Sequence, residues 1–213
     1  MSPRFGDSSR QTTAARKCDQ LAANPNDARR VAQGTPYGDL KPQAAEAADA
    51  CELAAKQNPN ELRFQYQLGR ALELMGDGPV RAKNRQRALE IHQALAKQGY
   101  AAAFDNLASL YRWDRKDVVA AVALWRKGVE LSDSDSMVSL ADLVEKNLVM
   151  PQSPNETPLE LYKRAADLGN ENGIRAYQAE LANAQQMQQV QIQQLQNQRM
   201  MLQFMGNLLR NAR

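Results

Sequence analysis

One histidine and two cysteines are the residues of this chain best suited to catalysis or metal binding, and their surroundings favour neither. His92 is the only histidine, and no serine, cysteine or carboxylate pattern of a catalytic triad lies next to it. In the repeat alignment described below, it takes the place of Trp125 and Tyr162. We therefore interpret His92 as a packing residue between helices.

The sequence also lacks motifs for phosphate or metal binding. The glycine pair in 76–78 has neither the lysine nor the serine or threonine of a P-loop. Asp133 and Asp135 supply too few ligands for calcium, and at the start of a helix they would complement its dipole. We expect no catalytic residue, no cofactor and no metal, and we predict that the chain is not an enzyme.

The two cysteines, Cys18 and Cys51, lie in similar sequence contexts, and each is followed by an Asn-Pro-Asn turn, at 24–26 and at 58–60. Two helices that end in the same way could pack side by side with their sulfur atoms facing. We predict a disulfide between them, and two buried free thiols are the alternative. Two cysteines without a nearby histidine make a poor zinc site.

The cysteine pairing decides where we expect the protein to act. A disulfide implies an oxidising compartment, so we expect a periplasmic or secreted protein whose signal peptide has been removed. Free thiols at both positions would instead indicate a cytoplasmic protein. Residues 1–14 contain no apolar stretch of the kind found in a signal peptide, and we expect a disordered lead-in there.

Composition favours an all-α fold that does not bind nucleic acid. Alanine, leucine, glutamine and charged residues are abundant, whereas β-branched and aromatic residues are sparse. The net charge is only +3, and the basic residues are scattered among acidic ones, which is not the pattern of a nucleic-acid-binding face. No apolar run approaches the roughly 20 residues that span a bilayer.

The middle of the chain contains a repeated pattern. Three segments, 88–99, 121–132 and 158–169, align without gaps, and each is predicted to be the second helix of a hairpin. The first helices align on Leu68, Leu107 and Leu140, each followed by a small residue that lets the partner helix approach closely. We predict helices at about 62–75, 80–98, 102–113, 117–131, 135–147 and 157–168.

This pattern resembles Sel1-like repeats, which are related to the tetratricopeptide repeat. The best matches are 103–111, with its spaced alanine, leucine and tyrosine, and 161–169, which ends in Lys-Arg-Ala-Ala-Asp-Leu-Gly. The resemblance covers about residues 62–175, although the second turn lacks glycine and Ser132 replaces a terminal glycine. Residues 15–60 more weakly resemble the helical section that precedes such repeats in exported alphaproteobacterial members.

The resemblance implies an α-solenoid of two-helix repeats whose first helices line a concave binding face. On that face we expect a protein or peptide partner to contact exposed residues, and a solvated helix surface without a partner is the alternative. The expected contact residues are Arg63, Tyr66, Arg70, Asp105, Ser109, Arg112, Asp142 and Glu145.

The end of the chain is rich in glutamine and methionine, and we predict a long projecting helix there. Its apolar side chains suggest self-association into a homo-oligomer, while docking onto the repeats and attachment to a membrane are the alternatives. The predicted oligomerisation residues are Ile192, Leu195, Leu202, Phe204, Met205, Leu208 and Leu209.

Together these patterns divide the chain into four parts: a lead-in (1–14), an N-terminal helix pair with both cysteines (15–60), a repeat solenoid (61–180) and an amphipathic assembly helix (181–213). The predicted function is a non-enzymatic scaffold or adaptor that binds a protein or peptide and self-associates. The competing hypothesis is a membrane-associated structural protein whose C-terminal helix attaches to a bilayer.

Overall fold

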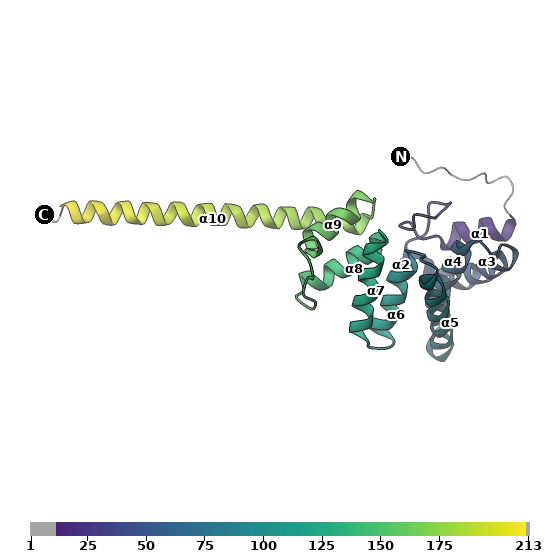
Figure 1. Cartoon of the computed structure of the whole chain (residues 1–213). Coiled ribbons are helices and arrows are strands. Elements are labelled where there is room, and N and C mark those ends of the chain that lie inside the picture. Colours follow the sequence, from purple (N-terminus) through teal and green to yellow (C-terminus); the bar gives the residue numbers. More distant parts are fainter. Residues whose placement is uncertain (1–11, 212–213) are drawn as a thin grey trace. The chain divides into compact units, whose positions relative to one another are not determined.

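The structure of the chain is a computed structural model, which describes residues 12–211 and their side chains up to residue 207. This part of the chain is helical and contains no strand (Figure 1). It divides into two units, one that ends at Ile174 and one that begins at Arg175. The predicted all-α class is therefore confirmed for the described residues.

The first unit begins with three helices and a short 3-10 turn: α1 (Thr13–Ala22), α2 (Tyr37–Leu40), η2 (Lys41–Gln43) and α3 (Ala44–Gln57). Three helical hairpins follow, and their helices are α4 (Leu62–Leu74), α5 (Gly78–Lys97), α6 (Ala103–Trp113), α7 (Val118–Glu130), α8 (Ser134–Glu145) and α9 (Pro158–Asp167). A 3-10 turn, η3 (Pro154–Glu156), precedes α9, and the long helix α10 (Glu171–Asn211) ends the described chain.

Consecutive helices of the first unit pack on one another. Within each hairpin the two helices are in extensive contact, and each hairpin also packs on the next through α5 with α6 and α7 with α8. Alanines and leucines from α1, α3, α4 and α5 form a continuous core with Leu107 and Leu110 of α6. The six helices predicted for this region are confirmed within a few residues. Asp117 and Thr157 cap two of them, since each side chain accepts a hydrogen bond from a backbone N–H group.

A disulfide joins α1 to α3, as predicted. The sulfur atoms of Cys18 and Cys51 are 2.03 Å apart, the Cα atoms are 4.7 Å apart, and both residues are fully buried. The prediction of a disordered lead-in through residue 14 was too long, because Thr12 caps α1, which begins at Thr13. Residues 1–11 of that prediction lie outside the described residues.

The second helix of each hairpin ends in the same backbone conformation. Gly99, Ser132 and Gly169 all have positive φ, at 72°, 62° and 83°. The residue after each one donates its N–H to a carbonyl five residues back: Tyr100 to Leu95, Asp133 to Gly128 and Asn170 to Ala165. This is the Schellman arrangement, so the serine that departs from the repeat pattern preserves the turn at a steric cost.

We expect Ser132→Gly to raise the free energy of unfolding by about 1 kcal/mol, because glycine adopts positive φ without the clash that a Cβ causes. Denaturant unfolding measures the change. Glu130→Gly, within regular α7, is the matched control and should lower stability by about 1 kcal/mol. A lower free energy of unfolding for Ser132→Gly would show that the positive φ of Ser132 does not strain the turn.

The aligned residues His92, Trp125 and Tyr162 are all buried between helices, which confirms the packing position predicted for His92. Gly69 leaves room for the imidazole, since a Cβ there would lie 2.6 Å from His92 Cε1. Each side chain also reaches a carboxylate of the preceding helix: His92 Nε2 lies 2.8 Å from Glu73, Trp125 Nε1 donates to Asp105 at 2.8 Å, and the Tyr162 hydroxyl donates to Asp142 at 2.6 Å. These polar contacts were not predicted.

Candidate interaction surfaces

The segment that joins α1 to α2, residues 23–36, lies against α4 and α8, the first helices of the first and third hairpins. Arg70 of α4 is buried beneath it and donates to the backbone oxygens of Ala22 (2.6 Å) and Thr35 (3.0 Å). At the other end of the segment, Tyr37 of α2 donates to Glu73 of α4. The segment therefore covers part of the face that we expected to bind a partner.

Asparagine side chains connect this segment to helices far along the chain. Asn24 Nδ2 donates to the Tyr66 hydroxyl at 2.9 Å and to Asp135 of α8 at 2.8 Å. Asn26 Nδ2 donates to the other oxygen of Asp135 at 2.7 Å. The segment thus links the first and third hairpins, which neighbour-only packing in a repeat array would not do.

Behind these contacts, buried polar side chains continue the network. The Tyr66 hydroxyl donates to Asn106 Oδ1 at 3.0 Å, and Asn106 Nδ2 donates to Glu73 Oε1 at 2.9 Å. Tyr100 donates its hydroxyl to Asp27 of the segment. Burial raises the pKa of Asp27 even though this hydrogen bond lowers it in part. The network satisfies groups that would otherwise be buried without partners.

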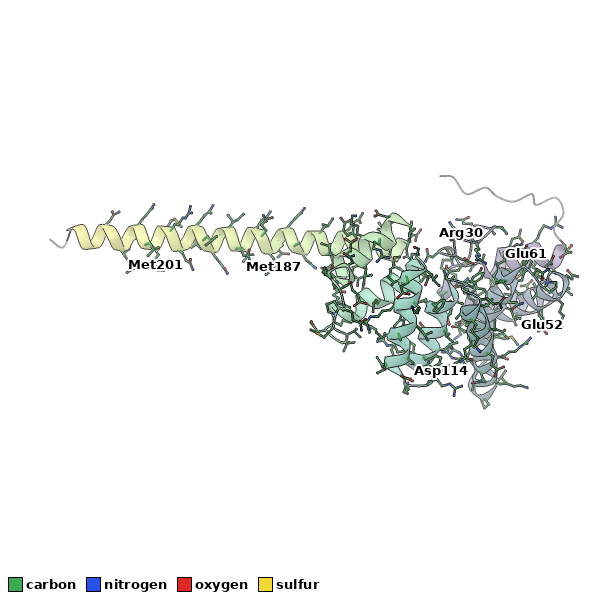
Figure 2. The ribbon with its side chains drawn as sticks, in the orientation of Figure 1. Arg30, Glu52, Glu61, Asp114, Met187 and Met201 are labelled. Atoms are coloured by element: carbon green, nitrogen blue, oxygen red, sulfur yellow. A yellow bond between two sulfur atoms is a disulfide. The ribbon has the colours of Figure 1, made fainter. Side chains whose placement is uncertain are left out.

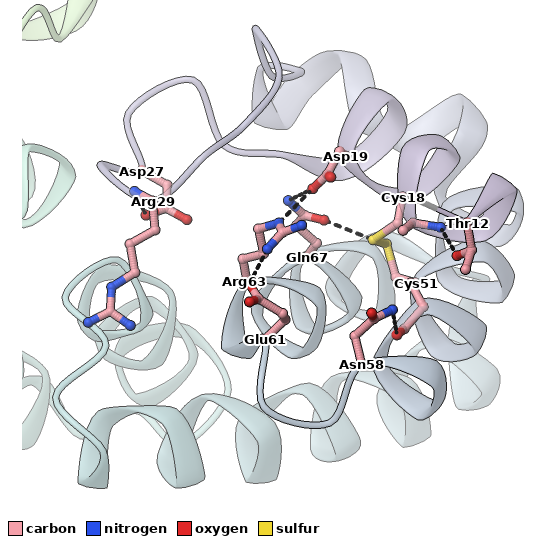
Figure 3. Close-up of polar contacts among 12 residues, drawn as sticks. Thr12, Cys18, Asp19, Asp27, Arg29, Cys51, Asn58, Glu61, Arg63 and Gln67 are labelled. Atoms are coloured by element: carbon pink, nitrogen blue, oxygen red, sulfur yellow. Dashed lines mark hydrogen bonds and ion pairs between the residues drawn. A yellow bond between two sulfur atoms is a disulfide. The ribbon is translucent and has the colours of Figure 1, made fainter. Parts of the chain in front are cut away.

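Close to the disulfide, the Arg63 side chain of α4 is also bound by polar side chains of the same chain (Figure 3). Its Nε lies 3.3 Å from Asp19 of α1, and its guanidinium also pairs with Glu61. Gln67 Nε2 donates to the same Asp19 oxygen at 2.9 Å, while its Oε1 lies 2.8 Å from Cys18 Sγ. Burial raises the pKa of Asp19 against the opposing effects of Gln67 and Arg63.

The structure therefore corrects three of the predicted contact residues. Tyr66 and Arg70 are buried, and the Arg63 side chain is only 12% exposed. They were expected on an open surface because the spacing along α4 places them on one helix face. The covering segment comes from another part of the sequence and carries no repeat pattern that would reveal its position.

The other five predicted contact residues remain at least partly accessible. Asp105 accepts from Trp125 and from Ser139 (2.7 Å), and Ser109 is half-buried. The Arg112 guanidinium lies 4.4 Å from the Trp113 ring centroid. Two carboxylates, Asp142 and Glu145, accept from Tyr162.

Three aspartates, Asp105, Asp133 and Asp135, influence one another at the starts of α6 and α8. Burial and the charge of Asp135 raise the pKa of Asp105 to about 7, and the hydrogen bonds from Ser139 and Trp125 oppose the shift. Burial and both neighbouring carboxylates also raise the pKa of Asp133. Among the described residues no group of histidine, cysteine and carboxylate side chains is arranged to hold a metal ion.

The raised pKa of Asp105 predicts a pH-dependent stability. Between its unfolded pKa of 3.8 and about 7, the folded protein retains a proton that the unfolded chain has released. The stabilisation is therefore fully present below pH 3.8 and is lost as pH rises through about 7. Asp105→Asn retains an acceptor for Trp125 and Ser139 without the charge.

We expect Asp105→Asn to match the parent protein most closely at pH 4 and to exceed its free energy of unfolding at pH 8 by roughly 2–4 kcal/mol, because the parent loses stability throughout the interval between the two pKa values. Urea unfolding at both pH values measures the difference. Asp167→Asn, in the exposed last turn of α9, is the control and should show no such divergence. Parallel pH profiles for the parent and Asp105→Asn would contradict the assignment.

Apolar side chains are exposed at the turns of all three hairpins, a feature that the sequence reasoning missed. We call this set of residues the turn edge: Val80, Trp113, Val119, Leu148 and Met150. Trp113 is 56% exposed and Met150 is 75% exposed. Leu148 and Met150 lie in the α8–α9 connection, and Val80, Trp113 and Val119 lie in the helical turns that flank the other two connections. The sequence signal was the presence of large apolar residues in or beside connections that are usually polar.

Arginines connect the turns of successive hairpins. Arg85 of α5 makes two hydrogen bonds, of 2.7 and 2.9 Å, to the carboxylate of Asp114 in the α6–α7 turn. Arg126 of α7 donates to the Met150 backbone oxygen at 3.1 Å and pairs with Glu156. The turns of the second and third hairpins are thus each held to the second helix of the preceding hairpin.

The second unit consists of α10 from Arg175 onward, and its side chains from 181 to 205 are exposed to solvent. Met187 and Met201 project from this helix (Figure 2). Of the predicted oligomerisation residues, Ile192, Leu195, Leu202, Phe204 and Met205 are exposed, while the side chains of Leu208 and Leu209 lie outside the described residues. None of the helices in the described part of the chain has both the length and the apolar character of a membrane-spanning segment.

A scan against protein-family models and searches of curated proteins and of solved structures found no match to this chain.

Proposed function

We propose that this protein is a non-enzymatic scaffold of the Sel1-like repeat kind, which binds another protein through its repeats and self-associates through α10. One observation carries the proposal. Among the described residues, the buried polar side chains of the repeats are used in contacts within the chain, whereas large apolar side chains remain exposed at the turn edge and along α10. Exposed apolar surface of this kind is typical of protein interaction sites.

Three features support the assignment to two-helix repeats stacked as a solenoid. The hairpins α4–α5, α6–α7 and α8–α9 follow one another and pack on their neighbours. Their second helices end in the same Schellman turn, and aligned positions carry buried aromatic or histidine side chains. Repeats of this kind expose their loops along one side, where partners commonly bind.

The partner surface that we favour combines the turn edge with the open residues at the ends of α6 and α8. Arg112 lies over the exposed Trp113, and Glu145 stands close to Leu148 in the sequence. Aromatic and arginine residues are enriched in protein interfaces, and such residues often contribute most of the binding energy. The partner would therefore contact the turn ends of the hairpins rather than the covered part of α4.

Site-specific photocrosslinking in cells that express the protein tests the repeat surface. A photoreactive amino acid at Trp113 or Met150 should give a discrete adduct with another protein, whereas one at Glu90, exposed on α5, should not. Discrete adducts at all three positions, or at none, would contradict a partner surface at the turn edge.

Membrane attachment through α10 is the second candidate. One observation favours it: between Leu181 and Asn207 the only charged residue is Arg199, and it is accompanied by exposed methionine, leucine and phenylalanine side chains. Flotation of the protein with anionic and with neutral liposomes separates the candidates. Flotation that is lost when the chain ends at residue 180 would favour a membrane-bound protein.

The disulfide favours an oxidising compartment, and we propose that the protein is periplasmic or secreted. Alkylation of unreduced protein isolated from its native cells, carried out after denaturation has exposed both buried positions, should modify neither cysteine. Modification of both would place the protein in a reducing compartment.

A further inference from the structure

We propose that α10 pairs with α10 of a second copy as a parallel, in-register coiled coil, centred on a hollow between Gln198 and Met205. This inference rests on the self-association included in the proposed function and specifies its surface and orientation.

The hollow lies along one face of α10. It has a volume of about 340 Å³ and is lined by Asn197, Gln198, Met201, Leu202 and Met205. Four of these residues, from Gln198 to Met205, have the spacing i, i+3, i+4 and i+7. That is the set of four side chains that receives one side chain from a facing helix in a coiled coil.

The same register continues along the helix. Positions seven apart carry Leu181, Gln188, Leu195 and Leu202, and the positions three residues later carry Ala184, Gln191, Gln198 and Met205. Position b of this register lies outside the seam and carries only alanine and glutamine, at 182, 189, 196 and 203. A partner helix therefore meets an apolar seam near Leu195–Met205 and glutamine layers nearer the start.

The charge on this helix suits a second copy. Between Leu181 and Asn207 the only charge is Arg199, so two copies repel one another little. In a parallel pair, Arg199 would lie beside Gln194 of the partner subunit rather than beside a like charge. An acidic or a basic partner would find almost no complementary charge here.

The distribution of apolar residues along the helix favours the parallel orientation. Exposed Leu195, Met201, Leu202, Phe204 and Met205 are concentrated towards the C-terminal end, whereas 182–194 is mostly glutamine, asparagine and alanine. When two copies pair in parallel along their whole length, their apolar C-terminal ends lie side by side. A full-length antiparallel pair would place leucine and methionine opposite glutamine.

Gln198 fixes the register of the proposed pair. In a parallel arrangement its side-chain amide lies beside the same amide of the second copy, and the two can exchange a hydrogen bond. A shift by one heptad would place one Gln198 beside Gln191 of the second copy but the other Gln198 opposite Met205, so only the in-register pair gives both Gln198 amides a polar partner.

Two variants of the full chain test the surface. Leu202→Glu places a carboxylate in the seam and should raise the dissociation constant of the oligomer more than about tenfold. Gln203→Glu adds the same charge at the adjacent position outside the seam and should change it less than about threefold. Circular dichroism checks that both variants retain the helix. Equal effects of the two substitutions would overturn the proposed seam.

Cysteine crosslinking tests the orientation. Gln191→Cys and Met205→Cys, each introduced alone, should both form disulfide-linked dimers under mild oxidation, since a parallel pair brings each position next to itself. Linkage only in a mixture of the two variants would show an antiparallel pair and overturn the inference while leaving self-association intact. A full chain that stays monomeric would overturn this inference and the assembly part of the proposed function, but not the repeat surface that photocrosslinking tests.

Discussion

Replacing Cys18 and Cys51 together by alanine should lower the free energy of unfolding by about 3–4 kcal/mol. The disulfide closes a loop with a sequence separation of 33, and chain-entropy reasoning gives a stabilisation of this size for such a loop. The loop contains the 23–36 segment, so the variant should also show faster amide exchange there. Urea unfolding measures the first effect and hydrogen exchange the second.

Reduction of the parent protein provides the control. Both sulfur atoms are fully buried, so a mild reductant should leave the folded protein oxidised and should act only after unfolding. Reduced, unfolded parent protein should then refold with the stability of the alanine variant. A loss below about 1 kcal/mol in the double variant would contradict the role assigned to the disulfide.

Arg70→Met should lower the free energy of unfolding by about 3 kcal/mol. The substitution leaves the backbone oxygens of Ala22 and Thr35 without their charged donor in a buried position. It also removes a positive charge that favours the ionised form of buried Asp27. The 23–36 segment should loosen, which amide exchange at Thr35 would report, since its N–H donates to Ala23.

Arg87→Met is the matched control for the loss of an arginine. Arg87 is exposed on α5 and pairs with the partly exposed Glu52, so its removal should cost less than about 1 kcal/mol. Equal losses of unfolding free energy for Arg70→Met and Arg87→Met would show that Arg70 does not hold the 23–36 segment to α4.

The helices of the three hairpins could be predicted because local signals agree. The spacing of leucines marks the buried face of α4, α6 and α8, and glycine or its substitute Ser132 marks the ends of the second helices. The disulfide followed from two similar contexts, each before an Asn-Pro-Asn turn. These signals lie within a few residues of the elements that they define.

The covered face could not be predicted, because its contacts join distant residues. Asn24 and Asp135 are 111 positions apart, and no sequence motif contains both of them. Single polar residues such as Asn24 are compatible with a turn, a cap or a network. The exposed turn edge was missed for another reason: its apolar residues lie off the buried helix faces or in a connection, and the prediction used the helical spacing only to identify buried faces.

Sedimentation equilibrium of the full chain, over concentrations up to tens of micromolar, tests the central claim most directly. Assembly through α10 predicts an average mass that rises with concentration above the 23.7 kDa of one chain, and a return towards one chain for Leu202→Glu. A mass of 23.7 kDa at every concentration would show that the apolar face of α10 does not hold copies of this protein together.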